Sequence, residues 1–294
     1  MNLKAIGLLF KETFVQWQED KVPLLAAALA YYTVFSIAPL LVIAIAIAGL
    51  AFGPEAAQGL VVSELKHLIG IEGAEALQAL LQNAYKPQSG TIAGLIGVAT
   101  LLLGASGVFA QLKESLNIIW HVSPQPGRGV IGFIKDRVLT FAMVLAIGFL
   151  LLVSLIVSAT LAAIGQWFNS WLAIPVSVWH WIDGLVSFST IALLFALMYK
   201  ILPDAKVAWG DVWIGAAITS LLFTAGKFLI GLYLGNSGIA SAYGAAGSFV
   251  IILIWIYYSA HILFWGAEFT QVYANRYGSQ IVSRAELKAL GSDS

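Results

Sequence analysis

The last apolar segment of the chain carries the residues best suited to acid–base or ion-binding chemistry. Within "WIYYSAHILFWGAEF", Tyr258, His261, Trp265 and Glu268 follow one another at spacings of three, four and three residues. These spacings place the four side chains on one face of a helix. A histidine can carry protons near neutral pH, and a carboxylate can hold the imidazole or bind a cation. The structural alternative is that His261 is a hydrogen-bonded packing residue and Glu268 an interfacial anchor or helix contact.

A second polar stripe lies in the first apolar segment, within "LAYYTVFSIAP". Tyr32 and Ser36 are four residues apart and share a helical face. Tyr32 lies about 12 Å from the predicted start of its helix, deeper than an interfacial tyrosine. Pro39 predicts a kink because it has no N–H and crowds the preceding turn, and Ser36 can bond to the loosened backbone. Together the two stripes predict a cavity open to the cytoplasm, lined by Tyr32, Ser36, Tyr258, His261 and Glu268.

Lys227 is a charge inside the fifth apolar segment, about 12 Å from its predicted outer end. Its stem can snorkel outward. Alternatively it faces the bundle, where it binds an anion or pairs with Asp183. If it faces the bundle, a polar path runs between the first, fifth and sixth segments, with Lys227 toward the outside and His261 and Glu268 toward the inside.

The composition is that of an integral membrane protein. Hydrophobic residues make up 60% of the 294 residues and charged residues only 10%, with a mean hydropathy of +0.89. A soluble domain carries about 25% charged residues. Zero net charge argues against a nucleic-acid partner, and the lack of cysteine removes disulfides and thiolate chemistry. The sequence has no HxH, HExxH, P-loop, GxGxxG or GxSxG motif, so we expect no enzyme activity, cofactor or metal.

Six segments are long enough to cross a hydrocarbon core of about 30 Å as helices. Lipid cannot satisfy open backbone groups, and the segments lack the alternation of barrel strands. The predicted fold is therefore an all-α, polytopic bundle of six transmembrane helices. The predicted spans are about 24–52, 91–112, 138–165, 184–202, 211–235 and 243–268.

The distribution of basic residues predicts the orientation. Twelve of the 15 Lys and Arg residues lie before the first span or after the second, fourth and sixth, and only Lys66 and Lys86 lie on the other side. This asymmetry places both termini in the cytoplasm.

Around the transmembrane domain, 23–275, we expect three further features. Residues 1–22 are predicted to form an amphipathic helix on the cytoplasmic surface, or one that packs under the bundle. Residues 53–90 are expected to form a helical outer loop, and 276–294 a cytoplasmic tail.

Several stretches together resemble the YihY/BrkB family of bacterial inner-membrane proteins. They are "LAAALAYYTVFSIAPLL", "LKESLNIIW", "ILPDAKVAWGDVWIGA" and "GLYLG…YGAAGSFVIILIWIYYSAHILFWGAEFTQVYA". The resemblance covers nearly the whole chain and implies a six-helix protein of the plasma membrane. Transport or efflux has been suggested for family members, and serum resistance is linked to BrkB. The older label ribonuclease BN is regarded as a misassignment. The matching positions are Tyr31, Tyr32, Ser36, Pro39, Pro203, Gly215, Tyr233, Gly235, Tyr243, Gly244, Trp255, Tyr257, Gly266 and Glu268, and Lys227 falls in a segment that resembles the family's fifth span.

Two functions are therefore compared. The first is a secondary transporter or exporter of a small polar solute or ion, coupled to protons or sodium. The alternative is a non-transporting membrane scaffold or envelope-integrity factor; a nuclease is disfavoured. The expected partners are the lipid bilayer and a small polar solute or ion, with no nucleic acid, and the sequence leaves an oligomer open.

Overall fold

The computed structural model describes rather more than half of the chain. The described residues are 3–53, 107–122, 176–236, 246–279 and 281–283, with single positions at 59, 78, 142, 242 and 243. The predicted outer loop and most of the second and third predicted spans lie outside the described residues.

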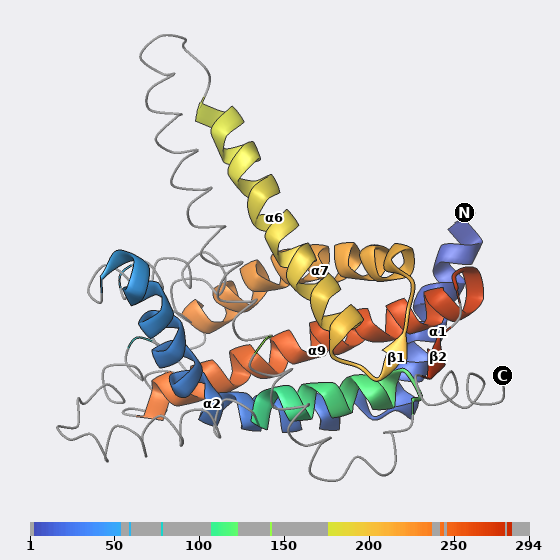
Figure 1. Cartoon of the computed structure of the whole chain (residues 1–294), viewed down its shortest axis with the longest axis horizontal. Coiled ribbons are helices and arrows are strands. Elements are labelled where there is room, and N and C mark those ends of the chain that lie inside the picture. Colours follow the sequence, from blue (N-terminus) through green and yellow to red (C-terminus); the bar gives the residue numbers. More distant parts are fainter. Residues whose placement is uncertain are drawn as a thin grey trace.

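The described residues are almost entirely helical (Figure 1). A helix over 107–119 carries no label in the figure. The other elements are α1 (Leu3–Glu19), α2 (Val22–Phe52), α6 (Val176–Ile201), α7 (Trp209–Asn236) and α9 (Gly247–Tyr277), with the short strands β1 (Ala205–Lys206) and β2 (Val282–Ser283).

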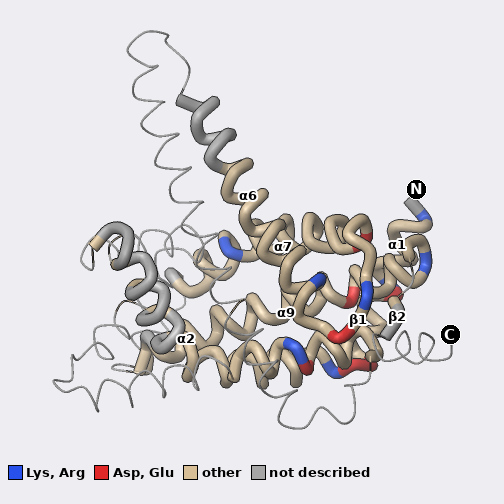
Figure 2. Tube along the Cα trace, viewed as in Figure 1, with Lys and Arg blue, Asp and Glu red and all other residues tan. Residues whose placement is uncertain are grey.

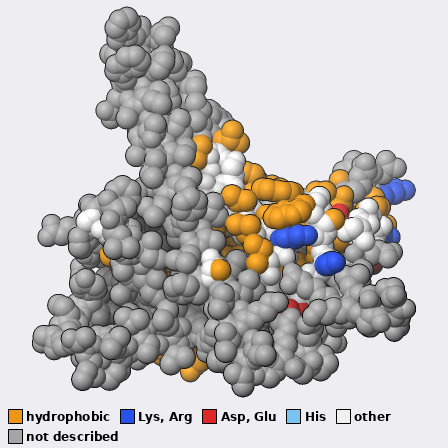
Figure 3. Space-filling view, viewed as in Figure 1, with side chains coloured by type: hydrophobic (Ala, Val, Ile, Leu, Met, Phe, Trp, Pro, Cys, Tyr) orange, Lys and Arg blue, Asp and Glu red, His pale blue; other side chains and the backbone are white. Residues whose placement is uncertain are grey.

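Three of these helices are long and apolar enough to cross a membrane, namely Gly184–Ile201, Trp209–Leu234 and Phe249–Tyr277. They correspond to the predicted fourth, fifth and sixth spans. Val22–Ile37, in α2, is a shorter apolar stretch. Hydrophobic side chains gather on the face drawn in Figure 3, as contact with lipid requires. On α7 the exposed large apolar residues are Trp209, Trp213, Ile214, Leu221, Phe228, Leu229, Leu232 and Tyr233.

The sixth predicted helix is longer than the sequence-based expectation. The sixth helix ends at Tyr277, nine residues beyond the predicted end at Glu268. The extension is stabilised by packing, because Phe269 and Val272 are buried against Leu9 of α1. The ribbon of α2 changes direction along its length (Figure 1); the side chain of Pro39 lies outside the description, so its role in a kink stays a prediction.

The centre of the fold is a close crossing of α7 and α9. Each helix contributes a glycine and, four residues later, a threonine: Gly215 and Thr219 on α7, Gly266 and Thr270 on α9. Each threonine Oγ1 donates to the carbonyl of its own glycine at 2.7 Å. A Cβ on either glycine would lie 1.8 Å from the threonine Oγ1 of the facing helix. The two backbones therefore meet without an intervening layer of side chains, as small residues permit in membrane bundles.

The N- and C-terminal elements meet at one end of the molecule (Figure 1). There β1 pairs with β2 in antiparallel register, and Asp211 accepts hydrogen bonds from the backbone N–H and the hydroxyl of Ser279, at 3.0 and 2.8 Å. Asn117 accepts a hydrogen bond from the Asp204 N–H at 2.8 Å. Most charged residues drawn in Figure 2 also lie at this end, and α7 and α9 are largely uncharged elsewhere.

Candidate functional site

Two sharp backbone reversals shape a polar site at this charged end. After the helix over 107–119, the N–H groups of His121 and Val122 donate to carbonyls three and five residues earlier, at 2.9 and 3.0 Å. This is a Schellman motif, in which His121 takes the left-handed position with φ 52°. Lys21 has the same φ of 52° between α1 and α2. Histidine adopts this conformation more readily than most residues, and the two turns bring Asp20 beside His121.

Asp20, His121 and Gln271 form a chain of polar contacts across three elements. The Nε2 atom of His121 lies 3.2 Å from the Asp20 carboxylate, and its Nδ1 atom lies 3.4 Å from the Gln271 amide nitrogen. With the Gln271 amide donating to Nδ1, a neutral imidazole carries its proton on Nε2 and donates it to Asp20. Side-chain exposure falls from 52% for His121 to 13% for Asp20. The chain thus leads from solvent toward α9.

Glu268 is the deepest charged residue of the site. Its side chain lies on α9, 0% exposed, with the Asp20 carboxyl group beside it. Among the described residues, neither Glu268 oxygen meets a hydrogen-bond donor. Both observations hold together because two ionised carboxylates are acceptors only and can bond to each other only when one carries a proton. Trp120 fixes the turn against α9 by donating from Nε1 to Ala267 O at 3.1 Å.

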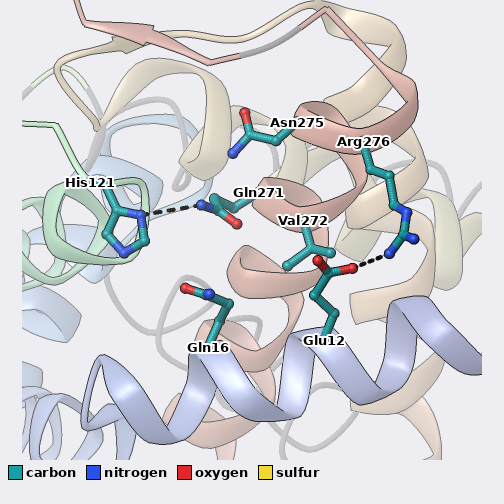
Figure 4. Close-up of a pocket in the computed structure, with 7 residues that line it drawn as sticks. All are labelled: Glu12, Gln16, His121, Gln271, Val272, Asn275 and Arg276. Atoms are coloured by element: carbon teal, nitrogen blue, oxygen red, sulfur yellow. Dashed lines mark hydrogen bonds and ion pairs between the residues drawn. The ribbon is translucent and has the colours of Figure 1, made fainter.

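A pocket of about 360 Å³ adjoins this chain of contacts. Figure 4 shows its lining side chains, which come from α1, the turn at His121 and the last turns of α9. An ion pair between Glu12 and Arg276 crosses the pocket from α1 to α9. The lining is polar and offers hydrogen-bond donors, acceptors and both charges to a small polar solute; it comprises Glu12, Gln16, His121, Gln271, Val272, Asn275 and Arg276. None of the six residues predicted from the sequence is among them.

The two predicted residues of α2 lie together. Ser36 is 2% exposed and Tyr32 is 42% exposed. A Cβ on Gly107 would lie 3.2 Å from Cδ1 of Tyr32 and 4.0 Å from Oγ of Ser36. This stripe therefore borders the start of the helix over 107–119.

The predicted face of α9 is divided between two neighbours. Tyr258 lies against α7, since a Cβ on Gly226 would be 2.9 Å from its hydroxyl. His261 lies against α1, with its ring centroid 5.6 Å from that of Trp17 and 4.5 Å from that of Tyr257. Lys227 follows Gly226 on α7 and is half-buried. A common hydrated path through these residues stays a prediction.

Asp20, His121 and Gln271 were not singled out from the sequence as site residues. Sequence reasoning tested His121 only for metal-ligand spacing, and its partners are 101 and 150 residues away. The available signal was local: "EDK" before Pro23 marks a helix break, and His121 follows a helix that ends before Pro124. No group of three or more His, Asp or Glu side chains suited to a metal occurs in the part of the chain that the structure describes.

Comparison with known proteins places this site in a family context. A family model described as "Virulence factor BrkB" matches residues 13–290. A "UPF0761 membrane protein" of Verminephrobacter eiseniae is 29% identical over 87% of this chain and 59% of the relative. A relative of the same description from Pseudomonas aeruginosa is 30% identical over 84% of this chain and 58% of its own length. A relative of this description from Tolumonas auensis is 28% identical over 85% of this chain and 80% of its own length.

The chain thus spans less than two thirds of the length of several curated relatives that it matches. No solved structure matches it significantly. The family match covers nearly all of the chain and agrees with the resemblance seen in its motifs. The protein therefore belongs to the BrkB family of membrane proteins.

Proposed function

We propose that the protein is a secondary transporter of a small polar solute or ion in the bacterial inner membrane. The observation that carries the proposal is Glu268, a fully buried carboxyl group on a helix apolar enough to span a membrane. Neither of its oxygens has a hydrogen-bond partner among the described residues. Ionisable side chains inside membrane spans are costly, and they commonly mark ion pathways and proton relays.

This carboxyl group favours transport over a purely structural role. A scaffold gains nothing from a buried acid that lacks a donor, since such a group costs stability and an apolar residue of similar volume is often at least as stable. The adjoining pocket of about 360 Å³ supplies polar groups for a solute at the same end of the molecule.

We place the transport path between α2, α7 and α9. Both α2 and α7 pack against α9. In this proposal the path is lined by Tyr32, Ser36, Lys227, Tyr258, His261 and Glu268, and it reaches the charged end of the molecule beside Asp20.

The proposed topology has six spans and both termini in the cytoplasm. Three contacts support placing the termini on one side. Glu12 near the N-terminus pairs with Arg276 at the end of α9, β1 pairs with β2, and α1 packs along α9. The basic residues that predict a cytoplasmic side include Lys4 on α1, Lys113 beside Asp204, Lys206 in β1 and Arg276 in the last turn of α9.

Transport can be tested with purified protein in proteoliposomes. The assay measures uptake and efflux of a panel of labelled amino acids, sugars and inorganic ions, with and without imposed proton and sodium gradients. We expect the wild type and the control variant Glu114→Gln to move at least one of these solutes and Glu268→Gln to lose that flux. Glu114 is an exposed glutamate on the helix over 107–119. A wild type that moves none of them, or a Glu268→Gln variant with unchanged flux, would contradict the proposal.

A further inference from the structure

We propose that Asp20 and Glu268 share one proton, and that this pair is the proton-binding site of the protein, loaded from the pocket through His121. The inference rests on the proposed transport function and names its coupling ion. It is carried by the position of the two carboxyl groups, one on the α1–α2 turn and one on α9, at the inner end of the polar chain that begins at the pocket.

The chemistry of the pair requires a donor that the residues described by the structure do not provide. Both Glu268 oxygens lack a hydrogen-bond partner in the described residues, and the Asp20 carboxylate faces His121 Nε2 at 3.2 Å. A single proton between the carboxyl groups turns one of them into an O–H donor for the other. It also removes one of two like charges at close range. One bound proton therefore satisfies both the hydrogen bonding and the charge.

Two basic residues at this end of the described part of the chain have other partners. Arg276 pairs with Glu12, and Lys113 lies 3.1 Å from Asp204. On α6, Tyr199 faces the same stretch of α9, and its hydroxyl donates to Leu263 O at 2.7 Å. Hard metal ions bind in cages of several oxygen ligands, and no such group of acidic or histidine ligands occurs in the described part of the chain. A proton needs only the two carboxyl groups.

His121 connects the pair to the pocket. Its ring lines the pocket (Figure 4), and Nε2 lies 3.2 Å from Asp20. A hydronium ion in the pocket transfers a proton to Nδ1 and becomes water, giving an imidazolium ion. The Nε2–H bond then breaks, its electron pair stays on nitrogen, and an O–H bond forms on Asp20. The imidazole and the new carboxylic acid are both neutral, so charge balances. The Gln271 amide has both a donor and an acceptor and can therefore face Nδ1 in either state.

Infrared difference spectroscopy of the full chain in lipid vesicles tests this inference without requiring solute flux. The readout is the carbonyl-stretching band of a protonated carboxylic acid, with its shift in deuterium oxide, recorded at about pH 7, where isolated Asp and Glu are ionised. We expect this band in the wild type and in the control Glu114→Gln. We expect it to vanish in both Asp20→Asn and Glu268→Gln, because the new amide donates to the remaining carboxylate. A wild type without the band, or a band that survives in both variants, overturns the inference.

The loading step and the folding of the variants have separate tests. Asn tolerates the left-handed backbone of residue 121, so His121→Asn should keep the band but slow its response to a pH jump at least tenfold; an unchanged rate removes His121 from the route. If a variant does not fold, the shared proton can still be tested by measuring the melting temperature of the wild type as a function of pH. A folded state that holds a proton which the unfolded chain releases loses stability as pH rises above neutrality. Melting that does not fall over this range counts against the shared proton.

The two proposals can fail separately. A protein that shows the band but moves no solute keeps the shared proton and loses the transport function. A protein that moves solute without a proton gradient and without the band keeps transport and loses the shared proton.

Discussion

Replacing Gly266 by alanine should destabilise the protein strongly, because the α7–α9 crossing leaves no room for a methyl group. The new Cβ would lie 1.8 Å from Oγ1 of Thr219 and 2.7 Å from the Tyr199 hydroxyl. Ordinary contact begins at 3.4 Å, so the helices must separate by at least 1.6 Å, the difference between 3.4 and 1.8 Å, or the threonine must turn away. That threonine is fully buried and bonded to its own helix.

The size of the effect follows from two contributions. Overpacking a well-filled interior costs roughly 1–3 kcal/mol. Moving Thr219 also disturbs the Tyr199 hydroxyl, which lies 3.1 Å from Thr219 Oγ1 and donates to Leu263 O; an unsatisfied buried polar group costs a further ~1–3 kcal/mol. Together they predict a loss of roughly 2–6 kcal/mol, equivalent to a fall of roughly 4–24 °C in melting temperature.

Thermal unfolding of the detergent-solubilised protein measures this loss. Gly184→Ala on α6 is the matched control, because no atom lies within 4 Å of its added Cβ; there the helix propensity of alanine should raise stability by up to about 1 kcal/mol. Adding Thr219→Gly to Gly266→Ala moves the small residue to the facing helix and should recover part of the loss. The reasoning is refuted if Gly266→Ala melts like the wild type, or if the two changes are simply additive.

Three further changes test other contacts at the charged end. Asn117→Ala removes the buried acceptor of the Asp204 N–H, and we expect about 1–3 kcal/mol lower stability; urea unfolding that matches the wild type would contradict this. Glu12→Gln weakens an exposed ion pair with Arg276 and should change stability by at most about 1 kcal/mol, with the difference shrinking in high salt. Gly278→Ala places a Cβ 2.4 Å from Oδ1 of Asp211, so the bonds to Ser279 should break and limited proteolysis should cleave the C-terminal tail faster, an effect absent in Gly210→Ala.

Hydropathy predicts the helices whose boundaries coincide with the ends of apolar sequence. For α7 the predicted span 211–235 lies within two residues of the observed Trp209–Asn236. For α9 the prediction stops nine residues short, at Glu268. The sequence there becomes polar at Gln271, Asn275 and Arg276, although α1 covers one side of the helix and keeps it folded. Hydropathy does not detect a helix that is stabilised by another segment of the chain.

Of the residues in the candidate site, only the most deeply buried one, Glu268, could be predicted from the sequence. Glu268 is conspicuous because it is a charge in an apolar segment. Asp20 lies at a helix junction, where charge is ordinary, and His121 follows an amphipathic helix. Their relation depends on two left-handed turns, at Lys21 and His121; histidine favours this conformation only modestly and lysine does not. Glycine in those places would have been a clearer signal.

The Gly–Thr crossing has a mechanical consequence for α9. On the α7 side, interlocked backbones resist sliding because any shift drives a threonine into the opposite chain. On the α1 side, the contact consists of tilted aromatic rings such as Phe10 on Trp265 and Trp17 on His261, which can change their packing with small rotations. Helix α9 is thus held rigidly against α7 on one side, whereas its interface with α1 on the other side can adjust. Because Asp20 follows α1 and Glu268 belongs to α9, the two carboxyl groups lie on opposite sides of this adjustable α1–α9 interface.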